Sequence, residues 1–397
     1  MGLTTKKQKG IIFPKIFALS ITIFIASIGF AFISTFWSVY LESFVHNNAV
    51  VGLISALFAL ISFCSFFLIT PIIEKYDKAK TFAFSMFVIA VSYFIFAITS
   101  NFYLFLGVAV LATFFHTLRI TSFGIIIKDK SPRNKLSRNE GLMYTLLNVA
   151  WLIGPLVAGT LSKYLKINII FGLSGIFVLI SSIYFLFLKI SEKKTRKRVD
   201  KNMIKLFFDF FKDKERKLTY FLGGGVDCWW SLIYIFIPLY ILEKGLDISY
   251  VGYFLFAVTI PLISLSYFFS KLAGKIGFKK IFRTGFFIAF LAALISFFVA
   301  NIYIILFILV LASIGLAMLE APTEAHFFDT LKGKEDLRFY GPYNTTIDVN
   351  NFVSRSIAGL ILLFLPFKFV FLFFSISMLG FSILSSRIKN INESKRK

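Results

Sequence analysis

The sequence has little of the chemistry that metals, disulfides and enzymes need. Its 397 residues include two cysteines, three histidines and only 20 acidic residues. Cys64 and Cys228 each fall inside a long apolar run, so the sequence predicts neither a disulfide framework nor a cysteine metal site. A phosphate-binding loop, a nucleotide motif and a nucleophile–base constellation are missing too. We therefore expect no enzyme activity, no cofactor and no resident metal.

Long polar stretches are also scarce, and apolar ones take their place. The chain is 58% hydrophobic and contains 54 Phe, against roughly 45–50% apolar residues in soluble domains. Twelve apolar runs reach the ~20 residues that cross a bilayer. Lipid leaves unpaired backbone groups without partners, so runs of this length indicate helices and not barrel strands. We expect an all-α membrane protein with twelve spans near residues 16–41, 49–73, 81–99, 102–127, 141–161, 168–188, 219–242, 250–273, 281–299, 302–328, 341–365 and 368–386.

Positive charge is abundant but confined to alternate connections. The formal charge is +23, and most Lys and Arg lie in the N-terminal segment, the central loop, the C-terminal tail and every second short loop. This distribution marks one membrane face and argues against a nucleic-acid surface. The first apolar run is too long for a cleaved signal peptide. We expect a multi-pass, monomeric plasma-membrane protein with both termini and the central loop in the cytoplasm.

Landmarks of the first half recur 200 residues later. They include Val51-Gly52 and Val251-Gly252, Lys75 and Lys275, Asp129 and Asp329, Gly141 and Gly341, and Ala158-Gly159 and Ala358-Gly359. Loop residues and helix residues coincide at the same offset, which indicates a duplicated unit of six membrane helices. We therefore predict pseudo-symmetric six-helix bundles at residues 1–190 and 219–397, joined by a basic cytoplasmic linker at 191–218.

The linker contains two kinds of sequence. Residues 192–198 are strongly basic, and residues 203–212 alternate aromatic and charged side chains. The second part predicts a short amphipathic helix whose aromatic side chains lie at the acyl boundary while Lys and Arg meet anionic headgroups. A solvated linker explains the basic part equally well.

One loop and its copy resemble the major facilitator superfamily. In that family a glycine, an acid, a second glycine and basic residues join the second and third helices, and here the positions fall at 70–80 and 270–280. The first copy has Thr70 and Asp77 at the glycine positions, and the second copy has Gly274 at the acid position. The resemblance implies a cytoplasmic gate motif made of Glu74, Lys75, Asp77, Lys78, Lys275, Gly277 and Lys279. Topology-setting loop charges are the alternative.

A second match lies in the run 141–161. Gly154, Pro155 and Gly159 are similar to the Gly-Pro motif of antiporter branches of the superfamily. The glycines would allow close packing of helices and the proline would permit a bend. The resemblance implies the major facilitator fold and transport by efflux, and a plain packing bend is the alternative.

Ionisable residues inside the spans are few and selective. Such groups cost several kcal/mol in hydrocarbon and normally face a cavity or a partner. Several lie seven or eight residues from the expected cytoplasmic ends, ~10–12 Å deep. We therefore expect a charge network for proton coupling, with Glu320 as the proton-carrying acid, the carboxyls Asp227 and Asp348 as alternatives to it, and Arg119 and Arg355 as movable partners. A static salt-bridge network is the alternative.

The remaining polar and aromatic residues of the same spans suit a solute cavity. Stacking and cation–π contacts favour a bulky apolar or cationic solute. The candidates are His116, Asn148, Trp230, Tyr234, Glu324 and Asn351. The sequence predicts a secondary transporter, with proton-coupled export favoured. Uptake by symport, a ligand sensor without turnover and a lipid-moving protein remain alternatives.

Overall fold

The structure is a computed structural model that describes residues 6–131, 136–190, 203–331 and 335–389. The described residues form helices and connecting turns only. Among them, twelve helical stretches are long and apolar enough to cross a membrane, which confirms the expected all-α fold. The helices are α1 Lys6–Val45, α2 Asn48–Lys75, α3 Lys78–Ile98, α4 Phe102–Lys130, α5 Leu136–Leu161, α6 Ile167–Phe187, α7 Met203–Phe210, α8 Lys214–Ser231, η2 Leu232–Phe236, α9 Ile237–Glu243, α10 Ser249–Ile276, α11 Phe278–Phe298, α12 Ile302–Ala317, α13 Glu320–Thr330, α14 Glu335–Phe364 and α15 Lys368–Ser385.

The chain folds into two compact units. Unit 1 comprises residues 1–36 and 64–197, and unit 2 comprises residues 37–63 and 198–397. The outer part of α1 and the first half of α2 therefore pack with the C-terminal half of the chain. In α2, a Cβ on Gly52 would come within 3.0 Å of the Gly359 Cα in α14. The two helices can cross this closely only because both residues lack a side chain.

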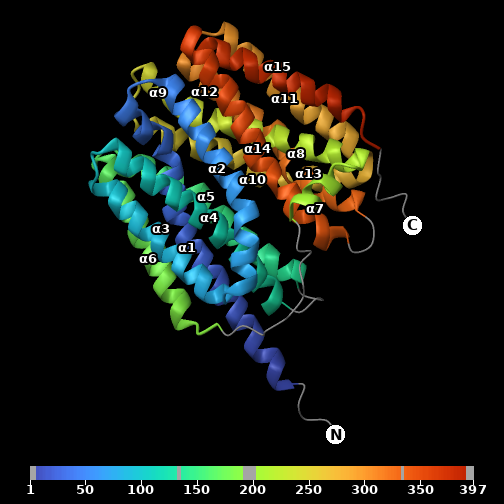
Figure 1. Cartoon of the computed structure of the whole chain (residues 1–397). Coiled ribbons are helices and arrows are strands. Elements are labelled where there is room, and N and C mark those ends of the chain that lie inside the picture. The colour runs from blue at the N-terminus through green and yellow to red at the C-terminus, as the bar shows by residue number, and fades with distance from the viewer. Residues whose placement is uncertain (1–5, 132–135, 191–202, 332–334, 390–397) are drawn as a thin grey trace. The chain divides into compact units, whose positions relative to one another are not determined.

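The duplication is visible in the helix boundaries of each unit. Helix α11 begins and ends 200 residues after α3, and α12 begins 200 residues after α4. Both α3 and α11 pack along the last helix of their half, α6 and α15 respectively (Figure 1). In unit 1 the Ser182 hydroxyl donates to the Ala83 carbonyl at 3.2 Å, and in unit 2 Ser382 donates to the Arg283 carbonyl at 3.0 Å. Equivalent helices are thus joined by equivalent hydrogen bonds.

The turns before α4 and α12 each contain an asparagine that caps the following helix. The Asn101 side chain accepts hydrogen bonds from the backbone N–H groups of Tyr103 and Leu104. Asn301 accepts from Tyr303 and Ile304 in the same way. Each asparagine satisfies two N–H groups that the first helical turn leaves without partners. The short loops at 99–101 and 299–301 therefore start their helices locally.

Two spans that the sequence predicts as unbroken helices are interrupted, and both interruptions are in unit 2. The span at 219–242 contains the π-helix η2 between α8 and α9, and the span at 302–328 divides into α12 and α13. Pro238 follows the first interruption and Pro322 the second. Proline has no N–H to donate and its ring crowds the carbonyl four residues earlier, which disrupts an α-helix locally.

Helix α7 packs inside unit 2 on one face. Leu206 and Phe210 are buried in a cluster with Tyr220, Phe327, Phe339 and Tyr343. Ile204 and Phe208 on the other face are 60% and 65% exposed. Asp209 pairs with Lys212 at 2.7 Å and Arg338 at 2.9 Å. The hydrogen bond from Lys212, with the nearby positive charges, lowers the pKa of Asp209 below its usual range.

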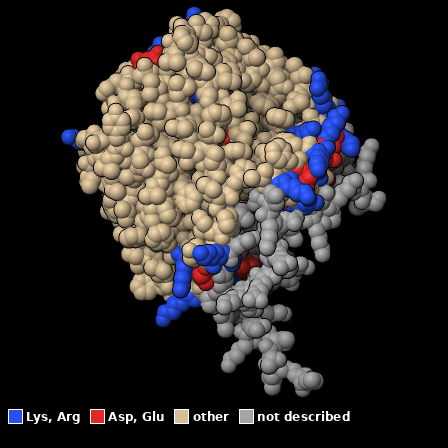
Figure 2. All heavy atoms as spheres, in the orientation of Figure 1, with Lys and Arg blue, Asp and Glu red and all other residues tan. Residues whose placement is uncertain are grey.

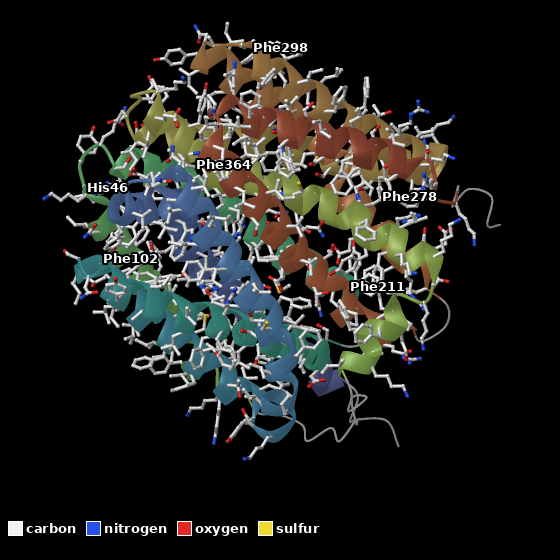
Figure 3. The ribbon with its side chains drawn as sticks, turned by 45° about the horizontal axis from the view of Figure 1, so that its top comes forward. His46, Phe102, Phe211, Phe278, Phe298 and Phe364 are labelled. Atoms are coloured by element: carbon white, nitrogen blue, oxygen red, sulfur yellow. The ribbon has the colours of Figure 1, made fainter. Side chains whose placement is uncertain are left out.

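Apolar side chains dominate the surface of the helices. Ile98, Phe187, Phe298 and Phe364 are each more than 70% exposed, as expected for residues that face lipid. In Figure 2, Lys and Arg lie mainly at the edges of the visible face, and uncharged residues form the broad area between. In Figure 3, Phe211 and Phe278 lie toward one end of unit 2, and Phe298 and Phe364 toward the other. Helix α11 thus runs the full length of the unit.

Candidate transport site

Arg355 of α14 is the centre of a polar network in unit 2. Its Nε donates to the Ser231 hydroxyl of α8 at 3.2 Å, and its Nη1 donates to the backbone carbonyl of Ser55 in α2 at 3.2 Å. The Ser231 hydroxyl in turn donates to Oδ1 of Asn351 at 2.7 Å. The guanidinium therefore joins three helices in the apolar part of the unit, where each hydrogen bond is worth more than on the surface.

Two acids lie close to this guanidinium. Arg355 interacts electrostatically with Asp348 on its own helix and with Asp227 on α8. The Asp348 carboxyl also accepts a hydrogen bond from the Ser62 hydroxyl of α2. The negative charge of Glu320 also repels that of Asp227. The structure thus brings together four of the five residues that the sequence assigns to a charge network.

Glu320 is placed by the break between α12 and α13. Helix α12 ends at Ala317, and Glu320 is the first residue of α13, whose N-cap Leu319 makes no side-chain hydrogen bond to the helix. The carboxyl therefore sits where unpaired N–H groups and the helix dipole favour negative charge. Pro322 accounts for the break, because its ring crowds the carbonyl of Met318.

Glu320 is also exposed, although it lies inside a membrane-length stretch. Ala321, Glu324 and Ala325 are exposed on the same face of α13. A carboxylate is costly in hydrocarbon, so a face with two of them borders water or a polar partner and not lipid. Glu320 and Glu324 are one turn apart and their charges repel. Tyr340 donates to Glu324 at 3.3 Å.

The π-helix η2 positions the aromatic candidates. Trp230 and Tyr234 pack with ring centroids 5.3 Å apart, and both are half-buried. Pro238 cannot donate to the Tyr234 carbonyl four residues earlier. That carbonyl instead accepts a hydrogen bond from the Ser38 hydroxyl of α1 at 3.4 Å. The irregular backbone thereby remains satisfied, as membrane helices require.

Arg119 belongs to unit 1, whereas the network around Arg355 belongs to unit 2. Arg119 is 8% exposed on α4, and its guanidinium lies 4.3 Å from the centroid of the Phe30 ring of α1. Its Nε has no hydrogen-bond partner. An unpaired buried cation costs several kcal/mol, and a cation–π contact returns about 0.5–2 kcal/mol. Among the described residues, the contact with Phe30 therefore compensates only part of the cost of burying Arg119.

His116 lies one turn before Arg119. Its Nε2 and the Tyr93 hydroxyl of α3 are 2.8 Å apart, and its ring packs edge-on against Phe30 at 4.9 Å between centroids. His116 is half-buried, whereas Tyr93 is 3% exposed. Ser122, one turn after Arg119, is fully buried and its hydroxyl has no partner. Three polar side chains at three-residue spacing thus share one face of α4.

The α5 residues have mainly packing surroundings. Gly154 lies directly against Ala31 of α1, where a Cβ would collide with the alanine methyl group. Pro155 is inside the helix, and Gly159 is buried. Asn148 is exposed on the same helix. Close packing by Gly154 fits the family motif.

The two copies of the loop motif start their third helices by different means. The Asp77 carboxyl accepts from the Lys80 backbone N–H at 2.8 Å and caps α3. Gly277 instead has φ of 92° and lies between α10 and α11, a conformation that glycine adopts without strain. Lys75 lies over the Tyr76 ring at 5.3 Å. Lys78, Lys275 and Lys279 lie at the adjacent helix ends, and the side chain of Glu74 is outside the described residues.

The sequence reasoning missed the hydroxyl groups of the network. Ser55, Ser62 and Ser231 look like ordinary small residues of membrane helices. The repeat carried a weak signal, because Ser231 and Asn351 stand opposite Ala31 and Trp151 in the first half. Among the described residues, no group of three or more His, Cys, Asp or Glu side chains could hold a metal ion.

Comparisons with known proteins agree with this fold. The family model described as Major Facilitator Superfamily matches residues 19–261 and 220–397. The chain is 25% identical over 363 residues to the quinolone resistance protein NorA of Staphylococcus aureus, covering 87% of this chain and 89% of that protein. It is 24% identical over 266 residues to an uncharacterized MFS-type transporter of Methanocaldococcus jannaschii, covering 66% and 69% respectively.

Solved structures show the same architecture at low sequence identity. A POT family transporter in complex with a thioalcohol-conjugated peptide superposes with a TM-score of 0.78 at 11% identity, covering 93% of this chain and 94% of that one. The nucleoside transporter NupG gives 0.74 at 12% identity, with 94% and 98% covered. Family model, relatives and fold agree, and the protein is a membrane transporter that belongs to the major facilitator superfamily.

Proposed function

We propose that this transporter exports a small organic solute in exchange for protons, with Glu320 as the proton-carrying acid. The observation that carries the proposal is the excess of acid in unit 2. Asp227 and Asp348 share the single guanidinium of Arg355, and Glu320 acts on Asp227 without a cation of its own. Like charges in a membrane repel strongly, and binding a proton relieves the repulsion.

The exposure of Glu320 distinguishes it from the other two acids. Asp227 and Asp348 are partly buried, and Asp348 has a hydroxyl donor. Glu320 is exposed at the first turn of a helix that starts beside a break. Protons can reach such a group directly, and a small movement of α13 changes its surroundings. Arg355 then serves as the movable partner of whichever carboxyl is ionised.

Similarity to NorA favours export over uptake. That relative is named for resistance to quinolones and covers most of this chain. A transporter confers resistance when it moves the compound out of the cell. Half-buried Trp230 and Tyr234 in unit 2, with Asn351 nearby in the network, offer stacking and hydrogen bonding to a bulky solute.

Alternating access completes the proposal. In this mechanism the halves predicted at residues 1–190 and 219–397, joined by the linker at 191–218, move in turn so that the solute path opens to one side of the membrane at a time. The protein lies in the plasma membrane with both termini in the cytoplasm. Cysteines introduced at Lys212 and Lys163 test this orientation, because only the Lys163 position is expected to react with an impermeant thiol reagent added to intact cells.

The test of function uses inside-out vesicles with an imposed proton gradient and the quinolone norfloxacin as the first probe. We expect the parent to accumulate norfloxacin and to release protons as it does so. Glu320→Gln should lose gradient-driven accumulation but keep exchange between labelled and unlabelled drug. Asp129→Asn is the matched control, since this exposed carboxyl lies at the far end of α4.

Other outcomes reject parts of the proposal. Unchanged pH dependence in Glu320→Gln would assign proton coupling to another group. Solute-linked proton entry that drives uptake instead of export would make the protein a symporter. A wider panel of labelled sugars, drugs and amino acids without any flux in either direction would favour a ligand sensor.

A further inference from the structure

We propose that the Arg119 cluster of unit 1 is a docking site for the anionic group of the solute, most simply a carboxylate. The cluster comprises Arg119, His116 and Ser122 of α4, with Tyr93 of α3 and Phe30 of α1. The inference rests on the proposed transport function and adds a substrate class to it. Its starting point is the guanidinium of Arg119, whose Nε has no hydrogen-bond partner among the described residues.

The donors of the cluster are buried and unused. Arg119 is 8% exposed, and its Nε has no hydrogen-bond partner. Ser122 is fully buried, and its hydroxyl is likewise without a partner. Buried polar groups of folded proteins are nearly always paired. Two unpaired ones at adjacent turns of one helix point to a ligand that satisfies both.

The described acids of unit 1 have other positions. The Asp77 carboxyl is occupied in capping α3. Asp129 is exposed ten residues farther along α4, ~15 Å away at 1.5 Å per residue. In unit 2, Asp227 and Asp348 already interact with Arg355. An anion brought by the solute is therefore the simplest complement to Arg119.

The remaining members of the cluster suit the recognition of a carboxylate. A planar guanidinium binds the two oxygens side by side. When His116 carries its proton on Nε2, it donates to the Tyr93 oxygen at 2.8 Å, and the Tyr93 hydroxyl is free to donate to an anion. Phe30 lies over the guanidinium at 4.3 Å and fixes its plane.

Access comes from the neighbouring positions of α4. His116 is half-buried, and Ile120, next to Arg119 in sequence, is 60% exposed. A side chain added at Gly124 would meet nothing within 4 Å. The cluster therefore lies next to exposed positions of α4, and His116 is the member of the cluster on α4 that is not fully buried.

Binding of matched probes to the purified full-length protein in micelles tests the site. The probes are norfloxacin and its methyl ester, and 1-naphthoate and 1-naphthamide, each pair differing in a single negative charge. We expect the parent to bind at least one acid about tenfold more tightly than its neutral partner. Arg119→Gln should remove this preference, and Arg119→Lys should keep part of it. Lys166→Gln, which removes an exposed charge of the same unit, should leave it intact.

The unfolding temperature of the ligand-free protein provides a second readout. Arg119→Gln should raise it or leave it unchanged, because the substitution removes an unpaired buried charge. The proposal is overturned if no acid is preferred by the parent, or if the preference survives in Arg119→Gln. A lowered unfolding temperature also contradicts it, since Arg119 would then pair with an acid of the protein. Proton-linked flux is measured separately, so loss of coupling with an intact acid preference rejects the proposed function alone.

Discussion

Arg119 and Arg355, which both lie in membrane-length helices of this transporter, have opposite surroundings. Arg355 in unit 2 donates to two oxygens and lies near two acids. Arg119 in unit 1 has an aromatic ring as its contact and an Nε without a partner. Arg355 thus connects helices through hydrogen bonds, whereas Arg119 has an Nε donor without an acceptor. A cation with hydrogen-bond acceptors on neighbouring helices holds those helices together, whereas a buried cation without them keeps an uncompensated desolvation cost.

Removal of Arg355 should have the largest effect on the stability of the folded protein. Arg355→Gln removes two hydrogen bonds and a positive charge that interacts with Asp227 and Asp348, and each hydrogen bond from a charged donor is worth about 1.5–3 kcal/mol. Chemical unfolding in micelles should therefore show a much larger loss for Arg355→Gln than for Arg119→Gln. Equal losses for the two substitutions would contradict the expected difference between the surroundings of Arg355 and Arg119.

The helix break beside Glu320 gives the next largest effect. Pro322→Ser installs the residue that α4 has at the equivalent position 122, and it restores a backbone donor. We expect a more continuous helix, a displaced Glu320 and about a tenfold loss of proton-driven flux, equivalent to ~1.4 kcal/mol. The reciprocal change Ser122→Pro measures whether a break in α4 has a similar cost. Normal flux in Pro322→Ser would show that the break itself is dispensable.

The asparagine caps test the equivalence of the halves. Asn101→Ala and Asn301→Ala each remove two hydrogen bonds at a helix start, for a loss of about 1 kcal/mol. The two losses should agree within error in unfolding experiments, and the double variant should show their sum. A marked difference would mean that the two asparagine caps contribute unequally to the free energy of unfolding.

The smallest effect is expected at Asp209, which has no counterpart in the first half. Its carboxyl has a lowered pKa because Lys212 donates a hydrogen bond to it, with further help from nearby positive charges. A lowered pKa stabilises the folded form above the ordinary carboxyl value near 4, and this stabilisation disappears as the pH falls through the lowered value. The protection factors of residues 203–212, which compare exchange with the intrinsic rate at the same pH, should therefore fall at acid pH in the parent. Asp209→Asn should lower these protection factors at neutral pH and remove their pH dependence.

The sequence predicts the fold well because lipid imposes simple rules. Length and apolarity locate all twelve spans, and the 200-residue offset anticipates that α11 begins and ends where α3 does. The breaks at η2 and before Glu320 escaped prediction, since a single proline inside an apolar run is compatible with a bent helix as well as a broken one. Pro155 and Pro71 lie inside helices that continue.

The candidate site could be predicted only in part. Ionisable residues in apolar runs stand out, and Asp227, Asp348 and Arg355 do lie within electrostatic reach of one another. Their hydroxyl partners do not stand out, because Ser55 and Ser62 resemble the many serines that bond to their own helix, such as Ser20 and Ser85. Whether Arg119 has a hydrogen-bond partner depends on the side chains of neighbouring helices, and residue spacing along α4 does not show which side chains those are.

The capped turns at Asn101 and Asn301 have a consequence for how the chain is made. Each turn is closed by its own side chain and joins two apolar helices that pack on each other, α3 with α4 and α11 with α12. Such a pair needs nothing from the rest of the protein to reverse direction. It can enter the membrane as a helical hairpin during synthesis, before the later contacts of α6 and α15 exist. Duplication of the gene therefore copied a unit of insertion as well as a unit of transport.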